Sequence, residues 1–280
     1  MVGSPRQIGG SPSTADCDLG DSLNRVACNC VKRVHGCTDG AGTRCHSASQ
    51  RPSRYPSITT LKNRILAELP EGERAFLLSD AEYVVVPAGQ TFAAPGEPVS
   101  LAFFPDTGAF CWISDMRTGH QVAVALVGTE GLLGISGIID IPQHPHRVVA
   151  LFESAGYRLP VETLRRVFDE HKGLRLAVLA HVGRQLVEIS SLVACARIHS
   201  HRQRLARWLV MLAEKSGESS LKITHDTLAQ VVGGPRHAVT VGLNRLRADG
   251  AIAHLRGRID ILDRSLLLSS ACECVSHRKS

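Results

Sequence analysis

Residues 223–264 carry the pattern that most restricts how this chain can fold, because they predict two short helices joined by a tight turn. Thr224 suits the N-cap of the first helix, since its hydroxyl can accept a hydrogen bond from an amide of the first turn. Gly233 can adopt the backbone angles of a sharp turn, and Pro235 stands where a second helix would begin. The apolar positions that would face a common core are Leu228, Val231 and Val232 in the first helix and Val239, Leu243 and Leu246 in the second.

The opposite face of the second helix is polar from its N-terminus onward. Side chains of these types hydrogen-bond base edges, and the N-terminal part of a recognition helix is the part that enters the major groove of DNA. Arg236 could bind a guanine or a phosphate, and Thr224 with its amide is a candidate for a phosphate contact. The candidate base-reading residues are Arg236, His237, Thr240 and Asn244.

Two apolar-rich segments, residues 251–254 and 258–262, follow the second helix and flank Arg256 and Gly257. They predict a β-hairpin wing with a basic tip, in which Arg256 would contact a phosphate. A helical hairpin of an ordinary all-α domain is the alternative for the two helices. This alternative does not explain why a helix cap, a tight turn, a row of apolar core residues and a β-hairpin follow one another at the expected spacing.

The charge distribution supports the same interpretation. The chain of 280 residues has a formal net charge of +6, but residues 58–198 hold 12 basic and 15 acidic side chains, whereas residues 199–280 hold 13 and 7. The helix-turn-helix pattern therefore lies in the most basic part of the predicted folded chain. DNA binding needs such an excess, because Lys and Arg displace the counterions of the phosphates.

The region before these helices differs, because short strand-like runs alternate there with Gly or Pro. Such runs at this spacing predict an antiparallel β-sandwich or roll. A short amphipathic helix over residues 58–73 would precede it, and residues 1–57, rich in Gly, Ser, Pro, Arg and Cys, are expected to be disordered. The strand-like runs are 83–86, 91–92, 101–104, 109–113, 121–127, 147–152 and 156–159.

A helix is predicted from about Val161 to Arg197, with a break near Gly173. Six of its residues are spaced alternately by four and three, which is the pattern of a coiled-coil seam and favours a parallel dimer over a single-chain core helix. These seam residues are Val178, Val182, Gln185, Ile189, Leu192 and Ala196. A second stripe would then cover the roll, and its members are Leu179, Leu186 and Val193.

Several of these runs resemble one protein family. The runs T-x-x-x-L-A-x-x-V-G and L-x-x-L-x-x-x-G-x-I, with Arg236 at the start of the second helix, resemble the winged helix-turn-helix of the Crp/Fnr transcription regulators. The run V-x-x-P-A-G-Q-x-F-x-x-P-G-E-P, from Val84, resembles the opening of their cyclic-nucleotide-binding-like β-roll. The resemblance covers roughly residues 58–275, and the ending Cys272-Glu273-Cys274 is similar to that of one subgroup.

The resemblance implies an α+β fold with an N-terminal, jelly-roll-like antiparallel β-roll, a long dimerisation helix and a C-terminal winged helix-turn-helix. The expected boundaries are 1–57 for a disordered extension, 58–160 for a sensor roll, 161–198 for the dimerisation helix and 199–275 for the DNA-binding domain. It further implies a sequence-specific transcription regulator that binds double-stranded DNA as a homodimer on a palindromic operator and contacts RNA polymerase. We expect a cytoplasmic protein without a membrane span or signal peptide, because no run approaches about 20 apolar residues.

The sequence leaves the ligand of the roll, and any cofactor, unassigned. Members of the family that bind cyclic nucleotides hold the ribose with a glutamate and the cyclic phosphate with an Arg-Ser/Thr pair. Residues 131–134, Gly-Leu-Leu-Gly, stand where that glutamate is expected, and Arg147 is followed by Val148 where the pair is expected. Arg147 alone stays a candidate for an anionic ligand, with a surface ion pair as its alternative.

A redox sensor built on an iron–sulfur cluster is another alternative. Such clusters need converging thiolates, usually from C-x2-C-type turns. The N-terminal spacing C-x-C-x6-C-x7-C matches neither that pattern nor a common zinc pattern, so no metal site is predicted. The candidate ligands for this alternative are Cys28, Cys30, Cys37 and Cys45.

A cupin-like metal-dependent enzyme is the rival functional class, because cupins share a β-roll. Their first motif is G-x5-H-x-H-x3-4-E. Here Gly137 precedes His144 by six intervening residues, and the next acid after His146, Glu153, comes too late. We therefore predict that the chain is not an enzyme.

Overall fold

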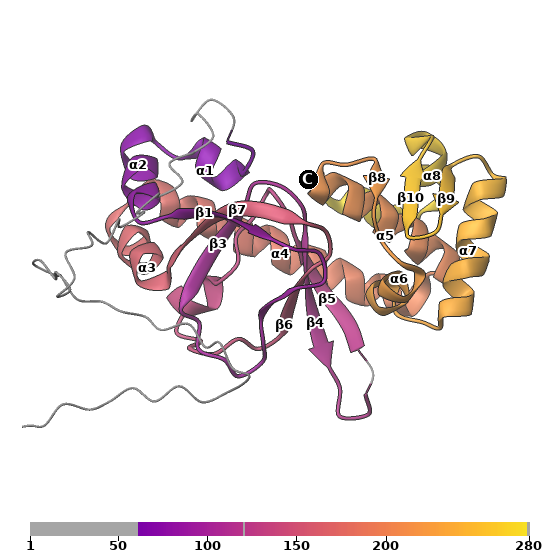
Figure 1. Ribbon diagram of the computed structural model, residues 1–280, viewed down its shortest axis with the longest axis horizontal. Coiled ribbons are helices and arrows are strands. Elements are labelled where there is room, and N and C mark those ends of the chain that lie inside the picture. Colours follow the sequence, from indigo (N-terminus) through magenta and orange to yellow (C-terminus); the bar gives the residue numbers. More distant parts are fainter. Residues whose placement is uncertain (1–60, 120, 279–280) are drawn as a thin grey trace, which may run out of the picture. The chain divides into compact units, whose positions relative to one another are not determined.

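The computed structural model of this protein describes residues 61–119 and 121–278, and Figure 1 shows their helices and strands in chain order. Two short helices precede a group of antiparallel strands, and further helices with a second, small sheet follow, which confirms the predicted α+β class. The extension predicted over residues 1–57 lies outside the described residues. The same holds for the candidate metal ligands Cys28, Cys30, Cys37 and Cys45.

The described chain opens with two short helices where the sequence predicts one over residues 58–73. α1 (Arg64–Glu68) ends at Leu69, and α2 (Glu71–Ser79) starts after Pro70. The single-helix prediction is wrong because proline has no N–H to donate and drives the residue before it into an extended conformation.

Seven strands form the β-roll as two antiparallel sheets, coloured from indigo through magenta to pink in Figure 1. One sheet has the strand order β1-β7-β3, and the other has the order β2-β6-β4-β5. Apolar side chains from both sheets meet in one core, where Phe92, Phe103 and Phe110 lie with ring centroids 5.3 to 5.8 Å apart. All seven predicted strands are confirmed: β1 (Glu82–Val86), β2 (Thr91–Ala93), β3 (Leu101–Pro105), β4 (Phe110–Asp115), β5 (Gln121–Val127), β6 (Arg147–Ala150) and β7 (Ser154–Pro160), with the 3-10 turn η2 (Ile135–Ile138) before β6.

Two helices follow the roll, α3 (Val161–Glu170) and α4 (Lys172–Ile198). The break between them falls at His171, whose backbone is extended, two residues before the predicted position at Gly173. The carboxylate of Glu73, on α2, accepts hydrogen bonds from two amides of the first turn of α4, at 3.2 and 2.9 Å. An anion at this place satisfies amides that lack a partner within the helix and interacts favourably with the helix dipole.

α4 has two apolar faces, and the face predicted as the dimer seam packs against its own chain. Val178 is buried in the core beside the roll, and Leu192 packs on the core of the C-terminal part. By contrast, Leu179, Leu186 and Val193 are 52%, 65% and 60% exposed. The prediction of which stripe covers the roll is therefore wrong. Both stripes are apolar at heptad spacing, so periodicity alone does not say which of them faces the chain itself.

α4 is also the one helix of the described residues that is long and apolar enough to cross a membrane, by length and composition only. Its most apolar window of 18 residues has a mean hydropathy of 1.3, and 17% of that window is buried. The buried share of this window is low because Leu179, Leu186 and Val193 are exposed. The same helix carries Glu188, which is buried and ion-paired to Lys215 at 3.1 Å.

The C-terminal part consists of helices around a three-stranded sheet with the order β8-β10-β9. The predicted inward stripe of the second helix is confirmed, since Val239, Leu243 and Leu246 are fully buried. The predicted hairpin is confirmed as β9 and β10. The elements are α5 (His201–Ser216), β8 (Ser220–Leu221), α6 (His225–Val232), α7 (Arg236–Ala248), β9 (Ile252–Leu255), β10 (Arg258–Ile261), α8 (Arg264–Ser270) and the 3-10 helix η3 (Glu273–Arg278).

The two tryptophans of the chain lie in different parts of this fold. Trp112, on β4 of the roll, stacks on His146 with ring centroids 6.0 Å apart. Trp208, on α5, is buried in the core that α5 shares with α6 and α7. Each part of the fold therefore contains one indole ring in a packed environment.

Candidate nucleic-acid interface

The turn between α6 and α7 has the geometry that its residues predict. The hydroxyl of Thr224 accepts a hydrogen bond from the Thr227 amide at 3.1 Å and so caps α6. Gly233 and Gly234 have φ angles of 73° and 152°, which side-chain-bearing residues rarely adopt. α7 also approaches α5 closely, because a Cβ atom at Gly242 would lie 2.6 Å from a methyl carbon of Leu205. These contacts fix α7 against the rest of the domain.

The four candidate base-reading residues share one side of α7. Arg236, His237 and Asn244 are exposed and Thr240 is half-buried, while Val241 adds an exposed apolar side chain between them. Their positions follow the spacing i, i+1, i+4, i+5 and i+8, which keeps them on a single helical face. The structure therefore brings these candidates together on one accessible surface.

Arg236 lies at the start of this face and pairs with Asp226 of α6. Its Nε lies 3.3 Å from the Asp226 carboxylate, and about two thirds of each side chain is exposed. An exposed pair of this kind contributes little to stability, at most about 1 kcal/mol. Arg236 can therefore exchange the carboxylate for an acceptor on DNA at small cost.

Two histidines that the sequence did not single out hold two of the candidate residues in place. His225 Nδ1 lies 3.2 Å from the Thr240 hydroxyl, and His254 Nε2 lies 3.1 Å from the side-chain oxygen of Asn244. The two imidazole rings are 5.8 Å apart. Burial, followed by the charges of Arg247 and His225, lowers the pKa of His254 and so favours the neutral imidazole, whose Nε2–H can donate to Asn244.

The wing places Arg256 at its tip. β9 and β10 pair in register from Ile252 to Leu255, and the connecting residues are Arg256 and Gly257, with a φ of 73° at the glycine. Arg256 is exposed, whereas the neighbouring Arg258 pairs with Asp260 at 2.8 Å. The tip therefore presents Arg256 to the solvent, as the sequence predicts.

In the roll, Arg147 is engaged by a carboxylate. It donates two hydrogen bonds to Asp115, from Nε at 3.0 Å and from a terminal nitrogen at 2.9 Å. These bonds lower the pKa of Asp115 below its usual value. Residues 131–134 are also unlike a ribose site, because Leu132 and Leu133 are fully buried and Gly131 packs against His181. The described roll therefore offers neither an acid nor an unengaged arginine at the positions where the resemblance placed them.

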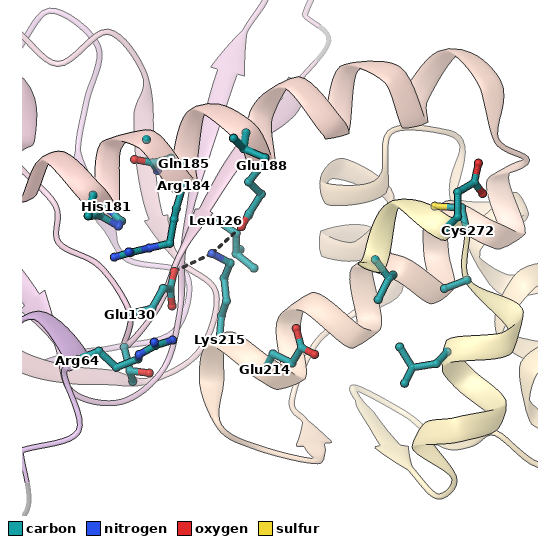
Figure 2. Close-up of a pocket in the computed structure, with 18 of the residues that line it drawn as sticks. Arg64, Leu126, Glu130, His181, Arg184, Gln185, Glu188, Glu214, Lys215 and Cys272 are labelled. Carbon is teal, nitrogen blue, oxygen red and sulfur yellow. Dashed lines mark hydrogen bonds and ion pairs between the residues drawn. The ribbon is translucent and has the colours of Figure 1, made fainter. Parts of the chain in front are cut away.

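A cavity of about 850 Å³ lies where the end of β5 meets α4, α5 and α8, and Figure 2 shows its lining. Lys215 lies between Glu130 and Glu188, with distances of 2.7 and 3.1 Å to their carboxylates. Burial alone would lower the pKa of Lys215, but the two carboxylates outweigh it and raise this pKa. Two carboxylates share one ammonium group at this wall of the cavity, which leaves the three ionised groups with a net charge of −1.

The cupin-type histidines do not converge in this structure. His146 stacks on Trp112, and His144 lies in a turn whose backbone pairs with Glu97. Within residues 61–119 and 121–278, the group of side chains close enough to hold a metal ion is a different one, formed by Cys195, His199, Cys272 and Cys274. Sequence spacing did not reveal this group, because its members come from segments 77 residues apart.

Comparisons with known proteins agree with this geometry. Residues 203–269 match the family model of the Crp-like helix-turn-helix domain. Over 181 residues the chain is 22% identical to the global nitrogen regulator of Synechocystis sp., an alignment that covers 61% of this chain and 80% of that protein. The corresponding protein of Synechococcus elongatus is also 22% identical, over 184 residues, with 62% and 83% covered.

Solved structures show the same fold. A transcriptional regulator of the CRP family from Thermus thermophilus superposes with a TM-score of 0.58 at 21% identity, covering 68% of this chain and 99% of that one. A CRP/FNR family regulator of the same organism has a TM-score of 0.57 at 24% identity, covering 68% and 98%. The described residues thus have the fold of the CRP/FNR regulators, and residues 203–269 form a Crp-like helix-turn-helix domain.

Proposed function

We propose that this chain is a DNA-binding transcription regulator of the Crp/Fnr type, which binds a palindromic operator as a homodimer. The observation that carries this proposal is the accessible polar face of α7 inside a domain that matches the Crp-like helix-turn-helix. The same domain lies in the most basic part of the folded chain. The relatives named as global nitrogen regulators favour the same class of function.

In the complex with DNA, each candidate residue has its own contact. α7 enters the major groove, where Arg236 and Asn244 bind base edges and Thr240 and His237 complete the contact. Thr224 and its amide, at the N-terminus of α6, bind a phosphate, and Arg256 at the wing tip binds another. His225 and His254 act as positioning residues, because they hold the side chains of Thr240 and Asn244.

In the proposed dimer, α4 pairs with α4 of a second copy of the chain. Its exposed stripe runs at spacings of three and four and consists of Leu176, Leu179, Gly183, Leu186, Ser190 and Val193. No atom lies within 4 Å of where a Cβ atom of Gly183 would be, so a second backbone can approach closely there. A parallel helix pair buries this apolar stripe and presents two copies of α7 to successive major grooves, about 34 Å apart.

In the proposed regulator, the roll controls the DNA-binding domain through the dimerisation helix. The roll, residues 58–160, serves as the sensor, residues 161–198 as the dimerisation helix and residues 199–275 as the reader. An occupant of the cavity at Lys215 would touch the roll, α4 and α5 at once, so its binding would favour one arrangement of these elements over another. By resemblance to the family, the DNA-bound dimer contacts RNA polymerase in the cytoplasm.

The test is selection of duplexes from a random library by the full-length protein, followed by titration of the enriched sequence at physiological salt. We expect a two-fold symmetric sequence that binds about 10³-fold or more tightly than random duplex. The double variant Arg236→Ala/Asn244→Ala serves as the loss-of-function variant: it should lose this preference for the enriched sequence while it stays dimeric. If the wild-type protein enriches no sequence, with or without cell extract as a source of effector, the proposal is wrong.

A further inference from the structure

Four potential metal ligands converge where α4 ends and the chain turns into α5. Cys195 lies in the last turn of α4 and His199 follows this helix, while Cys272 lies between α8 and η3 and Cys274 lies at the start of η3. Their ligand atoms all lie within 4.8 Å of one another. The Sγ atoms of Cys195 and Cys272 are 3.4 Å apart, and Cys274 Sγ is 3.7 Å from His199 Nδ1.

These separations fit a tetrahedral zinc ion. With Zn–S bonds of about 2.3 Å and Zn–N bonds of about 2.0 to 2.1 Å, tetrahedral angles place the ligand atoms roughly 3.6 to 3.8 Å from one another. The two contacts of 3.4 and 3.7 Å lie close to that range. Small side-chain rotations are therefore sufficient to centre an ion between the four atoms.

The local backbone explains why the ligands meet. Cys195 and His199 are four residues apart, and the helical hydrogen bond from the His199 amide to the Cys195 carbonyl, at 3.1 Å, places both side chains on one face. α8 then returns the chain to this end of α4. All three cysteines are buried, with exposed fractions of 2%, 3% and 7% for Cys195, Cys272 and Cys274.

The histidine is already oriented as a ligand. Its Nε2 lies 3.0 Å from a carboxylate oxygen of Glu273, while its Nδ1 faces the thiols. A proton on Nε2 donated to Glu273 leaves the Nδ1 lone pair directed at the site. Metal-binding histidines typically have such a carboxylate partner on the second nitrogen, where it fixes the tautomer and the ring orientation.

We propose that Cys195, His199, Cys272 and Cys274 bind one zinc ion in a closed structural site. Three thiolates, a neutral imidazole and Zn²⁺ carry a net charge of −1. Arg207 is fully buried, lies next to Cys195 and donates to the carbonyl and hydroxyl of Ser191, so its charge compensates that of the site. A Cys₃His set suits zinc, whereas iron–sulfur clusters more often use four thiolates.

The site would stabilise the junction between α4 and the reader. Zinc would connect Cys195 to Cys272 across 77 residues of chain, and the elements between them are α5 to α8. Removal of the metal would therefore free α5 and the C-terminal end to move relative to α4. The consequence for DNA affinity depends on the proposed function, but the presence of zinc does not.

The experiment measures zinc in full-length protein purified under reducing conditions. We expect roughly one zinc per chain in the wild type and loss of most of it in Cys274→Ser and in His199→Gln. Matched controls are Cys111→Ala, a buried cysteine of the roll, and His201→Gln, two residues from the site, which should keep their zinc. The combined replacement of Cys28, Cys30, Cys37 and Cys45 by serine should also leave the zinc in place.

A second measurement covers the case in which a site variant does not fold. Wild-type protein stripped by a chelator and titrated with Co²⁺ should develop the absorption bands of a tetrahedral cobalt–thiolate centre, and zinc should displace them. Metal-free wild type with intact secondary structure, or a Cys195–Cys272 disulfide in reduced preparations, would overturn the proposal. Zinc retained by both site variants would overturn it as well. Zinc bound without any DNA preference would instead contradict only the proposed function.

Discussion

α4 and α7 are both helices with one face buried in their own chain and one face exposed, but the exposed faces differ in chemistry. On α7 this face carries the exposed Arg236, His237 and Asn244 and the half-buried Thr240, with Val241 among them. On α4 the exposed stripe carries large apolar side chains, among them Leu179, Leu186 and Val193. Helical periodicity shows that a helix has apolar and polar sides, whereas the chemistry of the exposed side supports a proposal for its partner: nucleic acid for α7 and a second copy of the helix for α4.

The largest effect is expected when the apolar face of α4 is made charged. The double variant Leu179→Glu/Leu186→Glu should dissociate the dimer, because four carboxylates would face one another across the seam. Loss of the second reader should lower operator affinity by about 100-fold or more. Sedimentation velocity and operator titration measure the two effects.

The matched control for this variant is Val85→Glu, which alters an exposed valine on β1 of the roll. Val85 is 60% exposed, as Val193 is, but lies outside the stripe. It should change neither oligomeric state nor affinity. A Leu179→Glu/Leu186→Glu protein that remains dimeric would show that the exposed stripe of α4 is not the interface.

The second effect concerns the polar face of α7. Arg236→Ala should weaken binding to the selected operator by about 1 to 3 kcal/mol, because a bidentate base contact is lost, and should leave the dimer intact. Arg117→Ala, an exposed arginine of the roll, is the control and should have no effect. Unchanged discrimination between operator and random duplex would remove Arg236 from the reading surface.

The third effect is a pH dependence of the free energy of unfolding, which arises from His181 on the buried side of α4. Burial, supported by the charges of Lys215 and Arg184 and opposed by that of Glu130, lowers the pKa of His181 to about 4, below the usual 6.5 of an unfolded chain. The unfolded state therefore binds more protons between these values, and stability should decrease as the pH falls from about 7 toward 4. Between pH 7 and 5.5 the loss should be about 1 kcal/mol.

Urea unfolding of the wild type and of His181→Gln at several pH values measures this loss. The variant should show a flatter profile between pH 7 and 5.5, since glutamine does not titrate. Parallel profiles for both proteins would mean that His181 takes up its proton equally well in the folded chain, and that this face of α4 is more hydrated than its burial indicates.

The smallest effect is expected at the wing. Arg256→Ala should weaken binding to operator and random duplex alike, by about 1 kcal/mol or less, because a single exposed contact is lost. The slope of log affinity against log salt should become shallower by about one. A slope equal to that of the wild type would show that Arg256 does not neutralise a phosphate.

The winged helix-turn-helix could be predicted almost residue by residue, because its determinants are local. The cap at Thr224, the turn at Gly233 and the stripe at Val239, Leu243 and Leu246 all depend on neighbours in the sequence. A single helix over 58–73 is wrong because Pro70 separates α1 from α2. A proline is a local signal for the end of a helix, and it can be read from the sequence alone.

Other features could not be predicted, because they arise from distant segments. The choice of stripe on α4 depends on where the roll lies, and two similar stripes leave it undecided. Asn244 and His254 meet across the junction of α7 and β9, where no spacing rule applies. Cys195 and the pair Cys272 and Cys274 lie far apart in the sequence, and they come together only because α8 returns the chain to the end of α4.

The placement of the two indole rings has a practical consequence. Trp112 reports on the roll and Trp208 on the core beneath α7, and the chain contains no third tryptophan. A Trp112→Phe chain would thus emit from the C-terminal half alone, and Trp208→Phe from the N-terminal half alone. Coincident fluorescence transitions in denaturant would mean that both halves unfold in one cooperative step, and separated transitions would give each half its own free energy of unfolding.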